Sequence, residues 1–161
     1  MKITIIAAMT EDRVIGQDGD IPWNMPGEQE QFYNETFGHP VIMGRETFEN
    51  IVDKLGNPLP GRLNIVMSGS ESYPFEQTVT ARNKQAAIEA AKDSCKNEVF
   101  VAGGESIYEQ FINDAGRMVL TWIKEDYDGD VYYPDFSMNE WHTQSQTVTN
   151  NYTVIDYERR R

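Results

Sequence analysis

The sequence predicts a single α/β domain with a mostly parallel central sheet flanked by helices and a C-terminal antiparallel hairpin. Short apolar runs alternate with segments of helical pattern along most of the chain, as in repeated strand–helix–strand units. Two alternating segments around Asn150 and Asn151 end the chain and resemble a hairpin. Neither an internal repeat nor a linker-like change in composition divides residues 1–161, so we expect one domain.

The first unit contains a strand, a long loop, a helix and a second strand. Residues 3–8 form an apolar run that indicates a buried strand, and the polar, turn-rich segment 9–26 predicts a loop. A helix is expected over residues 28–37, because Gly38 and Pro40 would end it. The apolar residues 41–43 then predict the next strand.

The same pattern repeats twice more along the chain. A short helix from about residue 47 leads to a predicted strand at 63–67, and a short strand at 78–80 precedes an alanine-rich helix at 84–93. The elements that follow are strand 99–102, helix 106–111 and strand 118–123. Ligands of such sheets bind beyond the carboxyl ends of the strands, so functional residues should lie just after each strand.

Composition excludes several classes of function. A formal net charge of −12 opposes binding to nucleic acid or to an anionic membrane surface. The single cysteine, Cys95, cannot form an internal disulfide, and His39 and His142 are too isolated to predict a metal site. The N-terminal run has no basic region or cleavage site, and no segment has membrane-spanning length. We therefore expect a cytoplasmic protein without a bound metal. We also expect a monomer, because no exposed apolar stripe can be identified from the sequence.

Four features could carry chemistry, although each has an ordinary structural explanation. Glu28 follows an apolar, turn-rich segment and could act in proton transfer, but an acid in a helix's first turn often only complements the helix dipole. Residues 44–47 and the pair Gly103-Gly104 each join a strand to a helix, where backbone N–H groups could bind phosphate. Arg62 could bind a carboxylate through two hydrogen bonds, or could be a solvated residue beside a turn.

The order of these motifs resembles the dihydrofolate reductase family over nearly the whole chain. The motifs that carry the resemblance are Ala7-Ala8-Met9, Asp12-Arg13-Val14-Ile15-Gly16, Ile21-Pro22-Trp23, Pro40-Val41-Ile42-Met43-Gly44-Arg45-Glu46-Thr47-Phe48, Pro58-Leu59-Pro60-Gly61-Arg62-Leu63-Asn64, Ala102-Gly103-Gly104 with Ile107-Tyr108, Leu120-Thr121, and Gly129-Asp130 with Tyr133-Pro134. The resemblance implies a dihydrofolate reductase-like fold. It also implies NADPH-dependent reduction of 7,8-dihydrofolate to tetrahydrofolate, which supplies one-carbon metabolism.

The resemblance implies a role for each substrate-side residue. Glu28 would bind the amino group and a ring nitrogen of the pterin, with Thr121 assisting through water and Trp23 ordering water nearby. Arg62 would hold a glutamate carboxylate of the substrate. The remaining substrate-binding positions implied are Ile6, Ala7, Phe32, Ile51, Leu59, Ala102 and Tyr108.

The resemblance also implies an NADPH site. Ala8 and Ile15 would lie near the nicotinamide, and Arg45 would contact the 2′-phosphate. In this family a cis peptide bond joins the two glycines that correspond to Gly103 and Gly104. The other cofactor-binding positions implied are Gly16, Ile21, Gly44, Glu46, Thr47, Met67, Ser68, Gly69, Ala102, Glu105, Ser106, Ile107 and Tyr108.

The sequence departs from the pattern of many relatives at three places along the chain. Glu28 stands where many bacterial members have aspartate, a change that keeps the chemistry. Glu105 and Ser106 replace a small residue and a basic one, and Gly69 replaces a common side-chain donor. An acid near the cofactor phosphates weakens their binding, so these positions bear on the preference for NADPH over NADH.

The segments Asp20-Ile21-Pro22-Trp23 and Gly27-Glu28-Gln29 resemble a transferable, trimethoprim-insensitive subgroup of the family. The family resemblance implies that antifolates such as methotrexate or trimethoprim are ligands, whereas the resemblance to this subgroup leads to the hypothesis of insensitivity to trimethoprim. Two alternatives remain: a reductase of the same fold that acts on a ribosylamino-pyrimidine, and a nucleotide-binding module without catalysis. Glu28, Thr121 and Arg62 favour a pterin with a glutamate tail.

Overall fold

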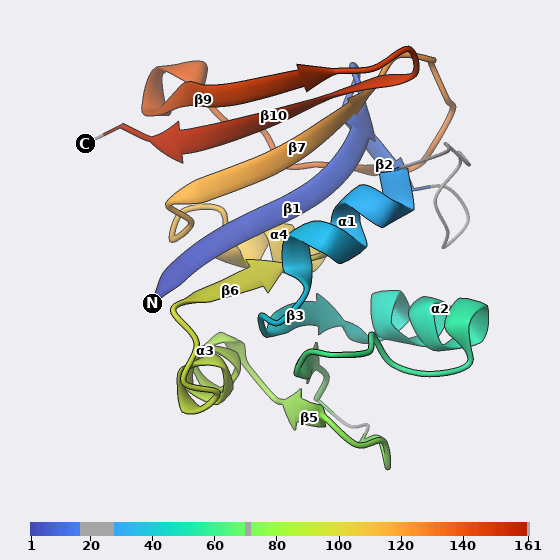
Figure 1. Ribbon diagram of the computed structural model, residues 1–161, viewed down its shortest axis with the longest axis vertical. Coiled ribbons are helices and arrows are strands. Elements are labelled where there is room, and N and C mark those ends of the chain that lie inside the picture. The colour runs from blue at the N-terminus through green and yellow to red at the C-terminus, as the bar shows by residue number, and fades with distance from the viewer. Residues whose placement is uncertain (17–27, 70–71, 161) are drawn as a thin grey trace.

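The computed structural model describes residues 1–16, 28–69 and 72–160 (Figure 1). One twisted sheet holds eight strands in the order β5-β4-β3-β6-β1-β7-β10-β9. All neighbouring strands from β5 to β7 run parallel, whereas β10 pairs antiparallel with both β7 and β9. The strands are β1 (Lys2–Thr10), β3 (Val41–Gly44), β4 (Asn64–Met67), β5 (Thr78–Ala81), β6 (Glu98–Val101), β7 (Arg117–Ile123), β9 (Trp141–Val148) and β10 (Tyr152–Arg159). The predicted fold class is thereby confirmed.

Helices cover both faces of this sheet. In Figure 1, α1 (Glu28–Thr36) lies in front of β1 and α4 (Glu105–Phe111) lies behind it. The side chains of β1 alternate between the two faces, as the pleat of a strand requires. Ile5 belongs to the core under α3 (Lys84–Asp93) and α4, while Ile6 belongs to the core under α1 and α2 (Arg45–Leu55).

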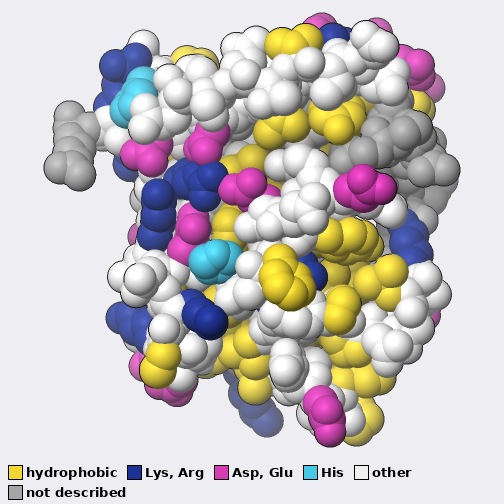
Figure 2. All heavy atoms as spheres, viewed as in Figure 1, with side chains coloured by type: hydrophobic (Ala, Val, Ile, Leu, Met, Phe, Trp, Pro, Cys, Tyr) yellow, Lys and Arg dark blue, Asp and Glu magenta, His cyan; other side chains and the backbone are white. Residues whose placement is uncertain are grey.

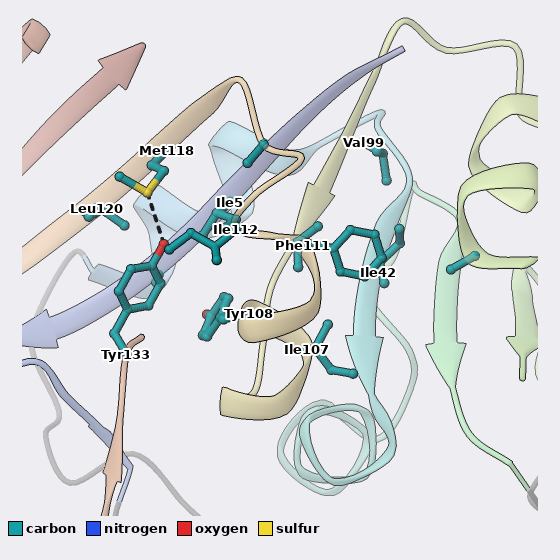
Figure 3. Close-up of a cluster of buried hydrophobic side chains, with 14 of the residues drawn as sticks. Ile5, Ile42, Val99, Ile107, Tyr108, Phe111, Ile112, Met118, Leu120 and Tyr133 are labelled. Carbon is teal, nitrogen blue, oxygen red and sulfur yellow. Dashed lines mark hydrogen bonds between the residues drawn. The ribbon is translucent and has the colours of Figure 1, made fainter. Parts of the chain in front are cut away.

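The core on the α4 side is the larger of the two. Figure 3 shows Ile107 and Phe111 of α4 directed toward Ile42 on β3. Phe111 is fully buried, and Ala87 and Ala91 bring α3 onto the same core. The hydroxyl of Tyr133 donates a hydrogen bond to the Met118 sulfur at 3.1 Å. Burial raises the pKa of Tyr133 well above 10.0, so its hydroxyl stays protonated.

A second, two-stranded sheet was not predicted. Residues 14–16 were expected to lie in a loop, but they form β2 (Val14–Gly16), which pairs with β8 (Val131–Tyr132). Val14 is buried, and its N–H donates to the Thr10 hydroxyl at 3.1 Å. Because β8 comes from a distant part of the chain, no local sequence pattern predicts this pairing. A short 3₁₀ helix, η1 (Met138–Glu140), precedes β9.

Helix boundaries agree best where the sequence carries a local signal. The predicted helix 84–93 is α3, whose N-terminus is capped by the Asn83 side chain, which accepts from Ala86 N–H at 2.8 Å. Helix α2 begins at Arg45, two residues before the predicted start. The residue before it, Gly44, is extended and supplies no capping side chain, so the sequence carries no local signal for this boundary. No helix in the described ranges is long and apolar enough to span a membrane.

Candidate active site

A cavity of about 600 Å³ opens at the carboxyl ends of the parallel strands. Ala8 of β1, Gly44 of β3 and Met67 of β4 reach it at those ends, and Ala102 follows β6. The cavity is lined by Ile6, Ala7, Ala8, Ile15, Gly16, Gln29, Gln31, Phe32, Tyr33, Gly44, Arg45, Glu46, Thr47, Asn50, Ile51, Lys54, Leu55, Met67, Ala102, Gly103, Gly104, Glu105, Ser106, Ile107, Tyr108, Thr121 and Val131. The site therefore lies where the fold class predicts it.

One wall of the cavity consists mainly of backbone atoms, because glycines form it. The N–H of Gly44 donates to the carbonyl of Gly103 at 2.8 Å, which fixes the end of β3 against the start of α4. A Cβ on Gly103 would lie 3.0 Å from the Tyr108 hydroxyl, and φ at Gly103 is +109°. The Tyr108 hydroxyl itself donates to the Ile6 carbonyl at 2.9 Å. Gly103 and Gly104 are joined by a cis peptide bond, as the family resemblance implies.

Two helices begin at this wall without side-chain caps. Gly44 precedes α2 and Gly104 precedes α4, and neither residue supplies a capping side chain. Helix α3 differs, because the side chain of Asn83 already bonds the N–H of Ala86 in its first turn. Uncapped first-turn N–H groups, together with the positive end of the helix dipole, favour a bound anion. The Thr47 hydroxyl lies 3.7 Å from the Cβ position of Gly104, so it borders the same space.

Charges of both signs surround these helix ends. Arg45, Glu46 and Glu105 are all exposed and all line the cavity. The Glu105 carboxylate accepts a hydrogen bond of 3.4 Å from the Tyr132 N–H, which connects α4 to β8. The first turns of both helices therefore carry an acid where an anionic ligand would bind.

The opposite wall is mainly apolar and comes from α1 and α2. Phe32 and Ile51 are partly buried residues that pack on the same core as Ile6. Thr121 of β7 is buried, and its hydroxyl bonds the side-chain oxygen of Gln31 at 3.5 Å. Helix α1 begins at Glu28, whose side chain lies outside the described part of the structure. An apolar slot with a few polar groups suits a flat heterocycle.

Arg62 lies behind this wall and is only 5% exposed. Its Nε donates to the Pro60 carbonyl at 2.8 Å, and its Nη1 donates to the Tyr33 carbonyl at 3.3 Å and to the Thr36 hydroxyl at 2.7 Å. No carboxylate among the described residues bonds it. Burial lowers the pKa of the Arg62 guanidinium from its usual value, and nearby Tyr33 acts in the opposite direction. A guanidinium keeps its charge at neutral pH, so Arg62 is a buried cation with neutral partners.

The comparison with protein families shows to which family the chain belongs. Residues 2–159 match the model of the family described as "Dihydrofolate reductase". The chain belongs to the dihydrofolate reductase family. The reaction of this dihydrofolate reductase domain is the NADPH-dependent reduction of 7,8-dihydrofolate to 5,6,7,8-tetrahydrofolate, a step of one-carbon metabolism.

Curated dihydrofolate reductases match along most of their length. The chain is 33% identical over 164 aligned residues to dihydrofolate reductase HdrB of Haloferax volcanii, covering 99% of this chain and 84% of that protein. It is 34% identical to the dihydrofolate reductase of Bacillus subtilis, covering 97% and 90%. A solved dihydrofolate reductase from Enterococcus faecalis has the same fold, with a TM-score of 0.83, 24% identity and coverage of 99% and 97%.

Most of the residues predicted for the dihydrofolate reductase site line the cavity. The predicted residues that the structure brings together there are Ile6, Ala7, Ala8, Ile15, Gly16, Phe32, Gly44, Arg45, Glu46, Thr47, Ile51, Met67, Ala102, Gly103, Gly104, Glu105, Ser106, Ile107, Tyr108 and Thr121. Leu59, Arg62, Ser68 and Gly69 are described but are not part of its lining. The predictions for Trp23 and Ile21, and for the Glu28 side chain, lie outside the described residues.

Several lining residues were missed by the sequence interpretation. Tyr33 follows Phe32 on α1, and Asn50 and Lys54 lie one helical turn apart on α2. Ile51, which was predicted, stands next to Asn50, so helical periodicity from it could have found Lys54 and Leu55. Val131 had no such signal, since its place at the cavity depends on the pairing of β2 with β8.

Proposed function

We propose that dihydrofolate occupies the α1–α2 side of the cavity and that Arg62 binds a carboxylate of its glutamate. The observation that carries this proposal is the buried guanidinium with three neutral partners. An unpaired cation inside a protein is costly, and a ligand carboxylate would supply the missing charge. Since the Tyr33 carbonyl accepts from Arg62 and Tyr33 lines the cavity, the guanidinium stands directly behind the cavity wall.

The pterin would bind at the opposite end of the slot. We assign Glu28 to the amino group and a ring nitrogen of the pterin, with Thr121 assisting through water and Trp23 ordering water there. Support comes from Thr121, which is buried at the cavity on β7, the strand that neighbours β1. The apolar residues Ile6, Ala7, Phe32 and Ile51 would enclose the ring, with Leu59 packed behind them.

The glycine wall and the uncapped helix ends suit NADPH. Gly44, Gly103 and Gly104 leave space for the phosphates beside the first turns of α2 and α4. We assign Arg45 and Thr47 to the phosphates, and Ala8, Ile15 and Gly16 to the nicotinamide end. The remaining cofactor positions are Ile21, Glu46, Met67, Ser68, Gly69, Ala102, Glu105, Ser106, Ile107 and Tyr108. When bound, NADPH supplies the hydride that reduces the pterin.

The chain's own contribution is alignment, exclusion of water and control of one proton. The cavity walls would hold the pterin next to the residues assigned to the nicotinamide, which would lower the entropic part of the barrier. The Glu28 carboxylate promotes protonation at pterin N5 by water without contacting N5 itself. The family resemblance further implies that the segment 9–24 controls the entry of that water, and its residues 17–24 lie outside the described ranges.

The test is an absorbance assay near the NADPH maximum with purified protein and dihydrofolate. We expect dihydrofolate-dependent oxidation of NADPH, slower oxidation of NADH, and a sharp fall in rate for Glu28→Gln. Glu30→Gln is the matched control, because Glu30 lies on α1, is exposed and does not line the cavity. Protein that binds NADPH but never oxidises it with dihydrofolate would contradict the proposal, and pyrimidine substrates would be tested next.

We further propose that antifolates such as methotrexate occupy the dihydrofolate site and that trimethoprim binds poorly. The support is Gln29, a polar residue that lines the cavity next to Glu28. A trimethoprim inhibition constant as low as that of sensitive bacterial enzymes would reject insensitivity. We also propose that residues 1–161 form one cytoplasmic domain that acts as a monomer; sedimentation of the purified protein would test the monomeric state.

A further inference from the structure

Among the aromatic side chains of the described residues, Phe37 is the one with more than half of its surface exposed to solvent. It follows α1 directly and is 63% exposed. Burying a phenyl ring is favourable, so a ring left in solvent beside a binding site invites a functional explanation. Its inner face is not in solvent, because it lies against the turn that contains Gly61 and Arg62.

The Phe37 ring is stacked over the guanidinium of Arg62. The Arg62 Cζ atom lies 5.4 Å from the ring centroid, within the range of a cation–π interaction. The ring thus covers the guanidinium from outside, while Tyr33, Thr36 and Pro60 fix the guanidinium through hydrogen bonds. Together these contacts hold the orientation of a side chain that otherwise has several rotatable bonds.

Gly61 makes this stacking possible. A Cβ at position 61 would lie 2.5 Å from Cε2 of Phe37, a separation that real Cβ atoms do not show. The φ angle of Gly61 is +74°, a conformation that favours glycine. The absence of a side chain at Gly61 therefore allows the Phe37 ring to pack against the turn next to Arg62.

We propose that Phe37 is a positioning residue that orients Arg62 and shields its ion pair with the substrate's glutamate carboxylate from water. The inference rests on the proposed role of Arg62. A cation held in one orientation loses less conformational entropy when a carboxylate binds. An aromatic cover also excludes water from one side of the ion pair, which strengthens the attraction. Phe37 thus acts on recognition of the glutamate tail and not on hydride transfer.

The test compares two substrates in the whole enzyme with NADPH. One substrate is dihydrofolate, and the other is a 7,8-dihydropterin that carries a methyl group in place of the benzoylglutamate. We expect Phe37→Leu to raise KM for dihydrofolate roughly threefold to tenfold, the size of a partly desolvated cation–π contact, with kcat unchanged. KM for the short pterin should stay the same, and Phe37→Tyr should restore the dihydrofolate KM to within about twofold because it keeps the ring.

Two further variants make the outcome decisive. Val148→Ala is the matched control, because Val148 is an apolar residue of similar exposure (61%) on the edge strand β9. The KM of Arg62→Leu for dihydrofolate tests the proposed role of Arg62 in binding the glutamate carboxylate, independently of Phe37. A normal dihydrofolate KM in Phe37→Leu, beside a raised KM in Arg62→Leu, would overturn the inference and leave the proposed function standing. A normal KM in Arg62→Leu would overturn both, and equal losses on the two substrates in Phe37→Leu would show a merely structural role.

Discussion

Arg62 and Arg117 are both largely buried arginines, yet their partners differ in charge. Within the part of the chain that the structure describes, Arg62 donates to two carbonyls and a hydroxyl and to no carboxylate. Arg117, with a side chain 16% exposed, bonds Asp156 of β10 at 2.7 Å, Glu98 of β6 at 2.9 Å and Glu35 of α1 at 2.7 Å. The guanidinium of Arg62 therefore has neutral hydrogen-bond acceptors, whereas that of Arg117 is surrounded by three carboxylates.

The two environments move the two pKa values in opposite directions. Hydrogen bonding to Asp156 is the main cause that raises the pKa of the Arg117 guanidinium, against the opposing effect of burial. For Arg62 burial dominates and lowers the pKa. The paired charge of Arg117 fits a structural role, whereas the neutral surroundings of Arg62 are the basis of its proposed role in binding a ligand carboxylate. In Figure 2, basic and acidic side chains lie next to one another along the left of the view, the side where β1 begins in Figure 1.

The largest effect is expected from Arg117→Met. Removing the cation leaves three carboxylates facing one another, and breaking a buried pair in this way costs about 3–5 kcal/mol of unfolding free energy. Urea unfolding of the variant and the wild type measures this difference. At a temperature where the variant is folded, its dihydrofolate KM should stay near the wild-type value. A loss below about 1 kcal/mol would place Arg117 with ordinary surface pairs.

Arg62→Leu should have the opposite profile. We expect KM for dihydrofolate to rise roughly thirtyfold or more, since loss of one partner of a buried charge pair costs at least about 2 kcal/mol of binding. Stability should fall by only about 1–2 kcal/mol, because the lost hydrogen bonds are to neutral acceptors. Steady-state kinetics and urea unfolding of the same preparation give both numbers. A large loss of stability in Arg62→Leu, with a normal KM for dihydrofolate, would mean that Arg62 has a structural role like that of Arg117.

Thr36→Val tests whether the neutral partners of Arg62 serve to orient it. Thr36 is fully buried, its hydroxyl accepts from Arg62 Nη1 at 2.7 Å and donates to the Phe32 carbonyl at 2.9 Å. Valine keeps the shape and removes the hydroxyl, so KM for dihydrofolate should rise roughly fivefold, which corresponds to about 1 kcal/mol for one hydrogen bond. An unchanged KM, measured beside that of the wild type, would mean that the other bonds suffice.

The smallest effect is expected from Lys2→Ala. Lys2 lies 3.6 Å from Glu158, and the two side chains are 46% and 37% exposed. Exposed pairs contribute at most about 1 kcal/mol, and salt screens them further. Urea unfolding at low and high salt should therefore scarcely distinguish this variant from the wild type. A loss close to that of Arg117→Met would show that burial does not explain the strength of the Arg117 cluster.

Local signals in the sequence determined the order and kind of most elements. Short apolar runs predicted most strands of the parallel sheet, alternating segments predicted the C-terminal hairpin, and helix α3 was predicted over its observed range, residues 84–93. The ordered motifs also placed Gly44, Gly103 and Gly104 at one site, since they follow strands whose carboxyl ends meet. These features depend on neighbours along the chain, and so one sequence suffices to predict them.

Only the tertiary structure decided which distant residues meet. The pairing of β2 with β8, the three carboxylates around Arg117 and the ring of Phe37 over Arg62 join segments far apart in sequence. In the sequence Arg62 is a residue beside a turn and Arg117 directly precedes the predicted strand 118–123, and nothing local distinguishes their charges. Burial and the identity of the partners set the electrostatic role of each arginine, and both arise when the sheet and helices pack together.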